Sequence, residues 1–199
     1  MERREALKLL ASAAALPVLS RDMFALFRQV HEQMPATAAL KTFNAHQDAT
    51  VAAIADLIIP QTDTPGAKAA RVNEFMDIVL ADWCEDAERA NFLSGLADVD
   101  VRSRRQFGKD FVDCTTDQQT DILAILDDEA TTIREQKLET RRNRRRRKPM
   151  EGPFFAGVKR LTLVGYYTSE IGETQELKLR NHFSRYQGCA VLEPETSRS

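Results

Sequence analysis

Apolar side chains recur every three or four residues through most of this chain, and that spacing constrains the fold more than any other feature. Between residues 44 and 60, for example, Val51, Ile54, Leu57 and Ile58 fall on one face of a helix. A half-buried strand would instead need an apolar residue at every second position, and no stretch sustains that alternation between hairpin turns. The sequence therefore predicts an all-α fold, a compact helical domain.

Capping residues and prolines predict where the first of these helices begin and end. Asn44 has Gln47 three residues later, which is the spacing of a capping box, so a helix is expected to begin at Asn44 and to stop before Pro60. After the turn-forming residues 61–66, a second helix is expected. Its apolar face consists of Val72, Phe75, Met76, Val79 and Trp83. A third helix is predicted from Asp86 to about Gln106.

Two more helices are predicted in the second half of the chain. Thr116 and Gln119 have the spacing of another capping box and are expected to open a fourth helix. The side predicted to be buried consists of Ile122, Leu123, Ile125 and Leu126. The last helix should open at Pro153, which suits a first turn. One of its faces consists of Phe154, Val158, Leu161 and Gly165.

The domain is expected to span residues 43–190, between an N-terminal segment and a short C-terminal tail. Residues 21–42 are interpreted as a linker with a short amphipathic helix, which could dock on the domain or on a partner. Its apolar residues at helical spacing are Met23, Phe24, Leu26, Phe27 and Val30. The chain is predicted to be irregular after about Arg185, and residues 191–199 form the tail.

The first twenty residues have the pattern of an export signal. A charged start is followed by the apolar stretch 9–19, which is too short to cross a bilayer because a spanning helix needs about 20 residues. The segment resembles the twin-arginine motif at Arg3, Arg4, Leu7 and Lys8. It departs from that motif at residues 2 and 6, and an ordinary amphipathic helix is the alternative. We expect a periplasmic protein, with cleavage of the leader left open.

One short segment concentrates the positive charge of an otherwise acidic chain. The formal net charge is −2, yet residues 141–148 read RRNRRRRK, within a polar, arginine-rich insertion at 131–149. A solvated loop is the first interpretation of this run, and contact with an acidic protein surface is the second. Nucleic-acid binding is disfavoured by the acidic remainder and by the lack of aromatic residues within the run.

Cysteine and histidine residues give no metal-binding spacing. The chain has three of each, without a CxxC pair, and it also lacks the GxGxxG, GxxxxGK[ST], HExxH and GxSxG motifs. Cys84 and Cys114 are expected to be buried or to form one internal bridge. Cys189 lies in the predicted irregular tail, where a disulfide to another subunit, a free thiol and an internal disulfide are all open.

Two segments carry a family resemblance: IIPQTDTPGAKAARVNEFMD at 58–77 and FFAGVKRLTLVGYYTSEIGE at 154–173. Both resemble the gluconate 2-dehydrogenase subunit 3 family, and the resemblance covers most of residues 43–190. It implies the small subunit of a bacterial FAD-dependent sugar or polyol dehydrogenase with a twin-arginine leader. Catalysis and FAD would belong to a separate GMC-type large subunit, often linked to a c-type cytochrome. No catalytic, cofactor or metal residue is expected in this chain.

The same two segments supply the residues expected to contact a partner. Pro60, Pro65 and Gly66 stiffen a loop, which lowers the entropy lost when a partner orders it. The others are Phe154, Phe155, Tyr166, Tyr167, Thr168, Ser169 and Glu170. Internal packing is the alternative for the loop and for the tyrosines alike. Ser169 and Glu170 are not expected to act as nucleophile and base, because no oxyanion-hole motif accompanies them.

These observations favour a non-catalytic subunit that stabilises a flavoprotein partner and shares its export signal with it. We expect contact with nucleic acid to be absent and contact with a membrane to be indirect. The alternatives are a binding subunit of an unrelated exported complex, a small enzyme that acts alone, and a nucleic-acid protein that binds through its arginine run.

Overall fold

The computed structural model describes residues 21–34, 39–140 and 153–178, and this part of the chain contains helices and no strand. The all-α prediction is confirmed. The helices are α2 (Arg21–Gln33), α3 (Ala45–Ile58), α4 (Val72–Asp82), α5 (Asp86–Phe107), α6 (Thr116–Thr140) and α7 (Phe154–Tyr167). Two short elements are the 3₁₀ turn η2 (Phe111–Asp113) and the π-helical turn η3 (Gly172–Glu176).

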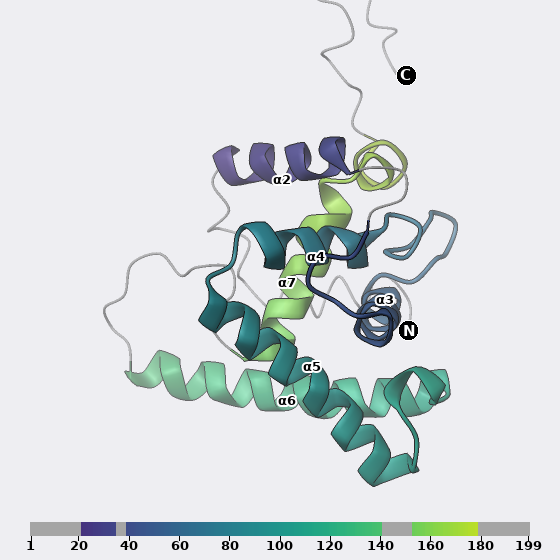
Figure 1. The fold of residues 1–199 in the computed structure, drawn as a ribbon, viewed down its shortest axis with the longest axis vertical. Helices are drawn as coiled ribbons and strands as arrows, with labels where there is room; N and C mark the ends of the chain where they lie inside the picture. The colour runs from purple at the N-terminus through teal and green to yellow at the C-terminus, as the bar shows by residue number, and fades with distance from the viewer. Residues whose placement is uncertain (1–20, 35–38, 141–152, 179–199) are drawn as a thin grey trace, which may run out of the picture.

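Helix α7 is the centre of the core, and α2, α3, α4, α5 and α6 all contact it. Figure 1 shows α7 running behind α4, with α2 at one end and α6 across the other. The side chains of Phe155, Val158, Leu161 and Val164 are buried against these neighbours. Nearly every turn of α7 buries at least one side chain, because helices surround it on several sides.

The predicted boundaries of α3 agree with the structure. The Asn44 side chain accepts a hydrogen bond from the backbone N–H of Gln47, and the Gln47 side chain accepts one from the backbone N–H of Asn44. This reciprocal capping box satisfies two N–H groups that the first turn leaves without helical partners. The helix ends at Ile58, two residues before Pro60.

The capping box of α6 lies one residue earlier than the sequence predicted. Thr115 and Gln118 form it, with hydrogen bonds of 3.1 and 3.4 Å between side chains and backbone. Gln119 instead donates from Nε2 to the carbonyl oxygen of Phe111, 2.8 Å away. Two threonines and two glutamines stand in tandem here, so spacing alone could not choose between them. The hydrogen bond to η2 engages the Gln119 side chain, so Gln118 is the glutamine that caps the helix.

Two residues expected on buried helix faces are exposed. Trp83 is 49% exposed because α4 ends at Asp82 and the chain turns away. Ile125 is 41% exposed, whereas Ile122, Leu123 and Leu126 are buried as expected. Helix α6 packs against α5 and α7, and the stripe that it buries there is narrower than the apolar pattern suggests.

Helix α6 also continues to Thr140, so the first ten residues of the predicted insertion at 131–149 are helical. The arginine run at 141–148, the leader with Arg3, Arg4, Leu7 and Lys8, and the tail with Cys189 lie outside the described residues. Among the helices that are described, none is long and apolar enough to cross a membrane.

Two buried aspartates hold the helices together through backbone N–H groups, and the sequence analysis did not identify either. Asp77 on α4 is 2% exposed and accepts hydrogen bonds from the backbone N–H groups of Lys41, Thr42 and Phe43. Asp100 on α5 accepts one from the backbone N–H of Phe111 and pairs with His46 at 2.7 Å. The available signal was an Asp amid the apolar residues of a helix, which must be hydrogen-bonded if it is buried.

Candidate functional site

The two segments that carry the family resemblance meet in the structure, although about a hundred residues separate them in the chain. The hydroxyl of Tyr166, at the end of α7, donates a hydrogen bond to the carbonyl oxygen of Pro65 at 2.7 Å. Beyond α7, the Glu176 carboxylate accepts a hydrogen bond from the Thr64 hydroxyl, also at 2.7 Å. The loop at 59–71 and the C-terminal end of α7 therefore form one unit, which we call the loop–α7 junction.

Gly66 allows the loop to close on itself within this junction. The backbone N–H of Ala67 donates to the carbonyl oxygen of Ile59 at 2.9 Å, which brings the two ends of the turn together. A Cβ atom at Gly66 would lie 2.6 Å from the backbone nitrogen of Gln61 and 2.7 Å from the oxygen of Ile59. Since these are backbone atoms, a larger residue would push the turn open.

Ser169 has an internal structural role beside the junction. It is 4% exposed, and its Oγ donates a hydrogen bond to the Tyr166 carbonyl oxygen at 2.6 Å. The same Oγ accepts a hydrogen bond from the backbone N–H of Gly172 at 3.1 Å. The hydroxyl thus links the end of α7 to η3, and both of its hydrogen-bonding functions are used.

Helix α2 docks on the domain next to the junction. Phe27 and Val30 are buried, and the Phe27 ring meets Phe75 of α4 edge-on at 5.7 Å between ring centroids. The His31 ring stacks on the ring of Phe75, with 4.7 Å between the ring centroids. Its Nε2 donates a hydrogen bond to the carbonyl oxygen of Gly165 at 2.7 Å. Of the two interpretations of residues 21–42, docking on the chain's own domain is the one that the structure shows.

This histidine should make the stability of the protein depend on pH. Burial is the main cause that lowers the pKa of His31 below its ordinary value of 6.5; the nearby Arg71 lowers it further, and the hydrogen bond to Gly165 opposes both. The unfolded chain therefore binds the proton more readily than the folded chain. The stabilisation from His31 is complete above pH 6.5 and is lost as the pH falls through the lowered pKa.

We expect the free energy of unfolding to fall more steeply between about pH 7 and about pH 5 in the wild type than in a His31→Gln variant. Glutamine can still donate to the Gly165 carbonyl but does not titrate in this range. Urea unfolding of both proteins at each pH, followed by circular dichroism, measures the difference. Parallel pH profiles would show that the histidine does not contribute.

The residues predicted to bind a partner divide into two groups in the structure. Four of the side chains are buried inside the chain: Phe155, Tyr166, Thr168 and Ser169. This corrects the expectation that they form a contact face, because the centre of the fold needs their apolar area and their hydroxyl hydrogen bonds. Gly66 is buried as well, whereas Pro60, Pro65, Phe154 and Tyr167 are partly exposed and Glu170 is exposed. For these five residues, contact with a partner stays a prediction.

The match to known families agrees with this geometry. A family model described as gluconate 2-dehydrogenase subunit 3 matches residues 45–188, most of the chain and both halves of the loop–α7 junction. The chain belongs to this family. No curated protein and no solved structure matches it. The subunit 3 family is named as part of a dehydrogenase, which is consistent with an accessory subunit.

In this subunit 3 protein, the described residues include no group of three or more His, Cys, Asp or Glu side chains placed to hold a metal ion. Cys84 and Cys114 are free thiols rather than the internal bridge considered above. Burial raises the pKa of the Cys84 thiol to about 11, and it also raises the pKa of Cys114. Both thiols are therefore protonated and weakly reactive at neutral pH.

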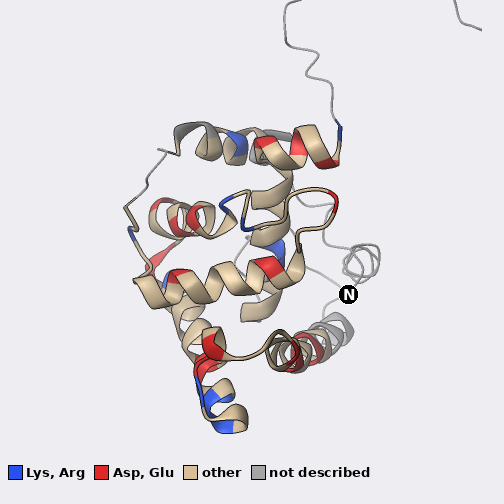
Figure 2. Ribbon diagram, turned by 90° about the vertical axis from the view of Figure 1, so that its right-hand side faces the viewer, with Lys and Arg blue, Asp and Glu red and all other residues tan. Residues whose placement is uncertain are grey.

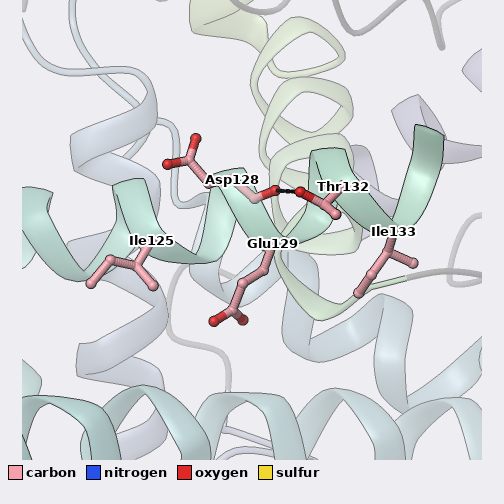
Figure 3. Close-up of a pocket in the computed structure, with 5 residues that line it drawn as sticks. All are labelled: Ile125, Asp128, Glu129, Thr132 and Ile133. Carbon is pink, nitrogen blue, oxygen red and sulfur yellow. Dashed lines mark hydrogen bonds between the residues drawn. The ribbon is translucent and has the colours of Figure 1, made fainter. Parts of the chain in front are cut away.

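The subunit 3 chain also has a shallow pocket on the outward side of α6. It has a volume of about 470 Å³ and is lined by Ile125, Asp128, Glu129, Thr132 and Ile133. Figure 3 shows the side chains of Ile125, Glu129 and Ile133 pointing to the same side of the helix, away from α7. Sequence reasoning missed this feature because it assigned Ile125 to the core.

Proposed function

We propose that this chain is the non-catalytic small subunit of a periplasmic FAD-dependent dehydrogenase that oxidises sugars or related polyols. The observation that carries the proposal is the match to the subunit 3 family across residues 45–188. In this proposal the substrate and the FAD bind to a GMC-type large subunit, and a c-type cytochrome can accept the electrons. The small subunit acts by binding.

In this role, binding of the small subunit would stabilise the folded large subunit, because binding and folding are thermodynamically linked. A partner that binds only the native state of the large subunit stabilises it by RT ln(1 + [L]/Kd), which is about 2.7 kcal/mol at a concentration 100 times Kd. An exposed Trp83 and the exposed isoleucines of α6 supply apolar area for such an association. The internal hydrogen bonds of the loop–α7 junction keep the small subunit rigid, which limits the entropy lost on binding.

The proposal includes shared export. Arg3 and Arg4 would direct the folded pair through the twin-arginine pathway, so the large subunit would need no leader of its own. Cys189 would form a disulfide to the large subunit once both reach the oxidising periplasm. Cys84 and Cys114, with their raised pKa values, are less suited to that reaction.

Expression of the large subunit with the wild-type chain, without it, and with an Arg3→Lys/Arg4→Lys variant tests these steps. We expect periplasmic dye-linked dehydrogenase activity only with the wild-type chain. The double-lysine variant should leave an active pair in the cytoplasm, since it changes the signal and not the folded domain. A non-reducing gel of the exported pair should show one cross-linked band that a Cys189→Ser variant lacks.

Full periplasmic activity of the large subunit expressed alone would contradict the stabilising and escorting roles. Export of the double-lysine variant at the wild-type level would contradict only the twin-arginine route and would leave the stabilising role in place. Turnover of a sugar by the purified small subunit with an electron-accepting dye would show that the chain is itself an enzyme.

A further inference from the structure

The outward side of α6 combines two exposed isoleucines with several carboxylates. Ile125 is 41% exposed and Ile133 is 37% exposed, although Ile122, Leu126 and Ala130 already give the helix a buried side. The two isoleucines are eight residues apart, which places them about 80° apart around the helix axis and about 12 Å apart along it. They lie at the two ends of the shallow pocket, with Glu129 between them (Figure 3).

Carboxylates surround these isoleucines. We call Asp121, Ile125, Asp128, Glu129 and Ile133 the α6 outer face. Among the ion pairs of the described residues, none involves Asp121 or Asp128, and Glu129 pairs with Arg102 of α5. In Figure 2, which views α6 nearly end-on, acidic colour is visible on this helix and basic colour is visible at the C-terminal end of α5.

The structure fixes the central carboxylate of this face in place. Both oxygens of Glu129 accept hydrogen bonds from Arg102 of α5, at 2.7 and 3.0 Å. Arg102 also donates to Asp98 at 2.6 Å, so one guanidinium is shared between two carboxylates and the local charge stays negative. Such a bidentate pair restricts the Glu129 rotamer and leaves the pocket preorganised.

Charge complementarity selects the kind of partner that fits. A second copy of the same face would place carboxylates against carboxylates, and an anionic membrane or a nucleic acid would be repelled in the same way. A cationic helix with an apolar stripe can lie along α6, because apolar side chains two turns apart match the spacing of the isoleucines. Its Lys or Arg side chains would then pair with Asp121 and Asp128.

We propose that the α6 outer face docks a basic amphipathic helix of the catalytic large subunit. This inference rests on the proposed function and names the surface through which that function works. Ile125 and Ile133 supply the apolar contact, and the carboxylates supply the orientation and the rate of encounter.

The test measures binding of the purified large subunit to purified variants of the whole chain, by biolayer interferometry at several salt concentrations. An Ile125→Ser/Ile133→Ser variant should raise Kd by at least about tenfold, as expected when apolar anchors at the centre of an interface are lost. The matched control is Val101→Ser on α5, which removes an apolar side chain that is 55% exposed outside this face and should leave Kd unchanged. Circular dichroism and thermal unfolding establish that each variant is folded.

An Asp121→Asn/Asp128→Asn variant tests the charge. Its Kd should rise at low salt, and the dependence of its Kd on salt should be weaker than that of the wild type, because two screened attractions have been removed. If the wild-type chain binds the large subunit and both double variants bind it with the wild-type Kd, the docking surface is elsewhere and the proposed function stands.

If the wild-type chain does not bind the large subunit at all, the proposed function and this inference are both overturned. Analytical ultracentrifugation of the purified chain without the large subunit measures whether the chain forms a homodimer. A homodimer that dissociates when the two isoleucines are replaced would assign the α6 outer face to self-association and overturn the inference.

Discussion

Replacing Asp77 with alanine is expected to lower the free energy of unfolding by more than about 3 kcal/mol, which is a change of more than a hundredfold in the folding equilibrium. The Asp77 carboxylate is buried and accepts three backbone hydrogen bonds of 2.7–2.9 Å from residues 41–43. Alanine would leave three N–H groups without acceptors and would release the segment that leads into α3. Chemical unfolding followed by circular dichroism measures this loss.

Asp82 provides a matched control, because it contacts the same segment from a solvent-exposed position. Its carboxylate accepts a hydrogen bond from the Lys41 side chain at 2.7 Å, and about half of each side chain is exposed. An exposed pair of this kind contributes less than about 1 kcal/mol, so Asp82→Ala should cost little. Equal losses for the two variants would show that burial and the backbone contacts of Asp77 are not what stabilises the fold.

Replacing Gly172 with alanine is expected to cost about 3 kcal/mol, at the upper end of the usual range for overpacking. A Cβ atom at this position would overlap the carbonyl oxygen of Tyr166 and lie 2.8 Å from its carbonyl carbon. Because both are backbone atoms, the end of α7 and η3 would have to separate. That movement would break the hydrogen bond between the Gly172 N–H and the Ser169 Oγ and would disturb the Thr64–Glu176 contact.

Gly108 is the control for a glycine-to-alanine change without crowding. It has φ of 75° and no atom within 4 Å of an added Cβ, so only the left-handed backbone conformation opposes alanine, at a cost of about 1 kcal/mol. Hydrogen exchange read by mass spectrometry should show lost protection at 165–176 in Gly172→Ala and none there in Gly108→Ala. Unchanged protection in both variants would show that the close approach at Gly172 is not needed.

Local signals in the sequence determined the helices and the family of this protein. The Asn44–Gln47 capping box, the stop before Pro60 and the apolar spacing of α4, α5 and α7 each depend on residues within about four positions of one another. A sequence displays such short-range relations directly. For the same reason, the resemblance at 58–77 and 154–173 led to the family that the match at 45–188 identifies.

The tertiary structure decided which side chains those helices bury and which they leave exposed. Tyr166 is fully buried beside the partly exposed Tyr167, and Ile125 is exposed beside the buried Leu126. Adjacent residues of one type or similar hydrophobicity look alike in a sequence. Their burial depends on where distant helices pass, as in the contact of Tyr166 with Pro65. The choice of Asp77 as the acceptor for residues 41–43 depends on the same long-range packing, which no local pattern encodes.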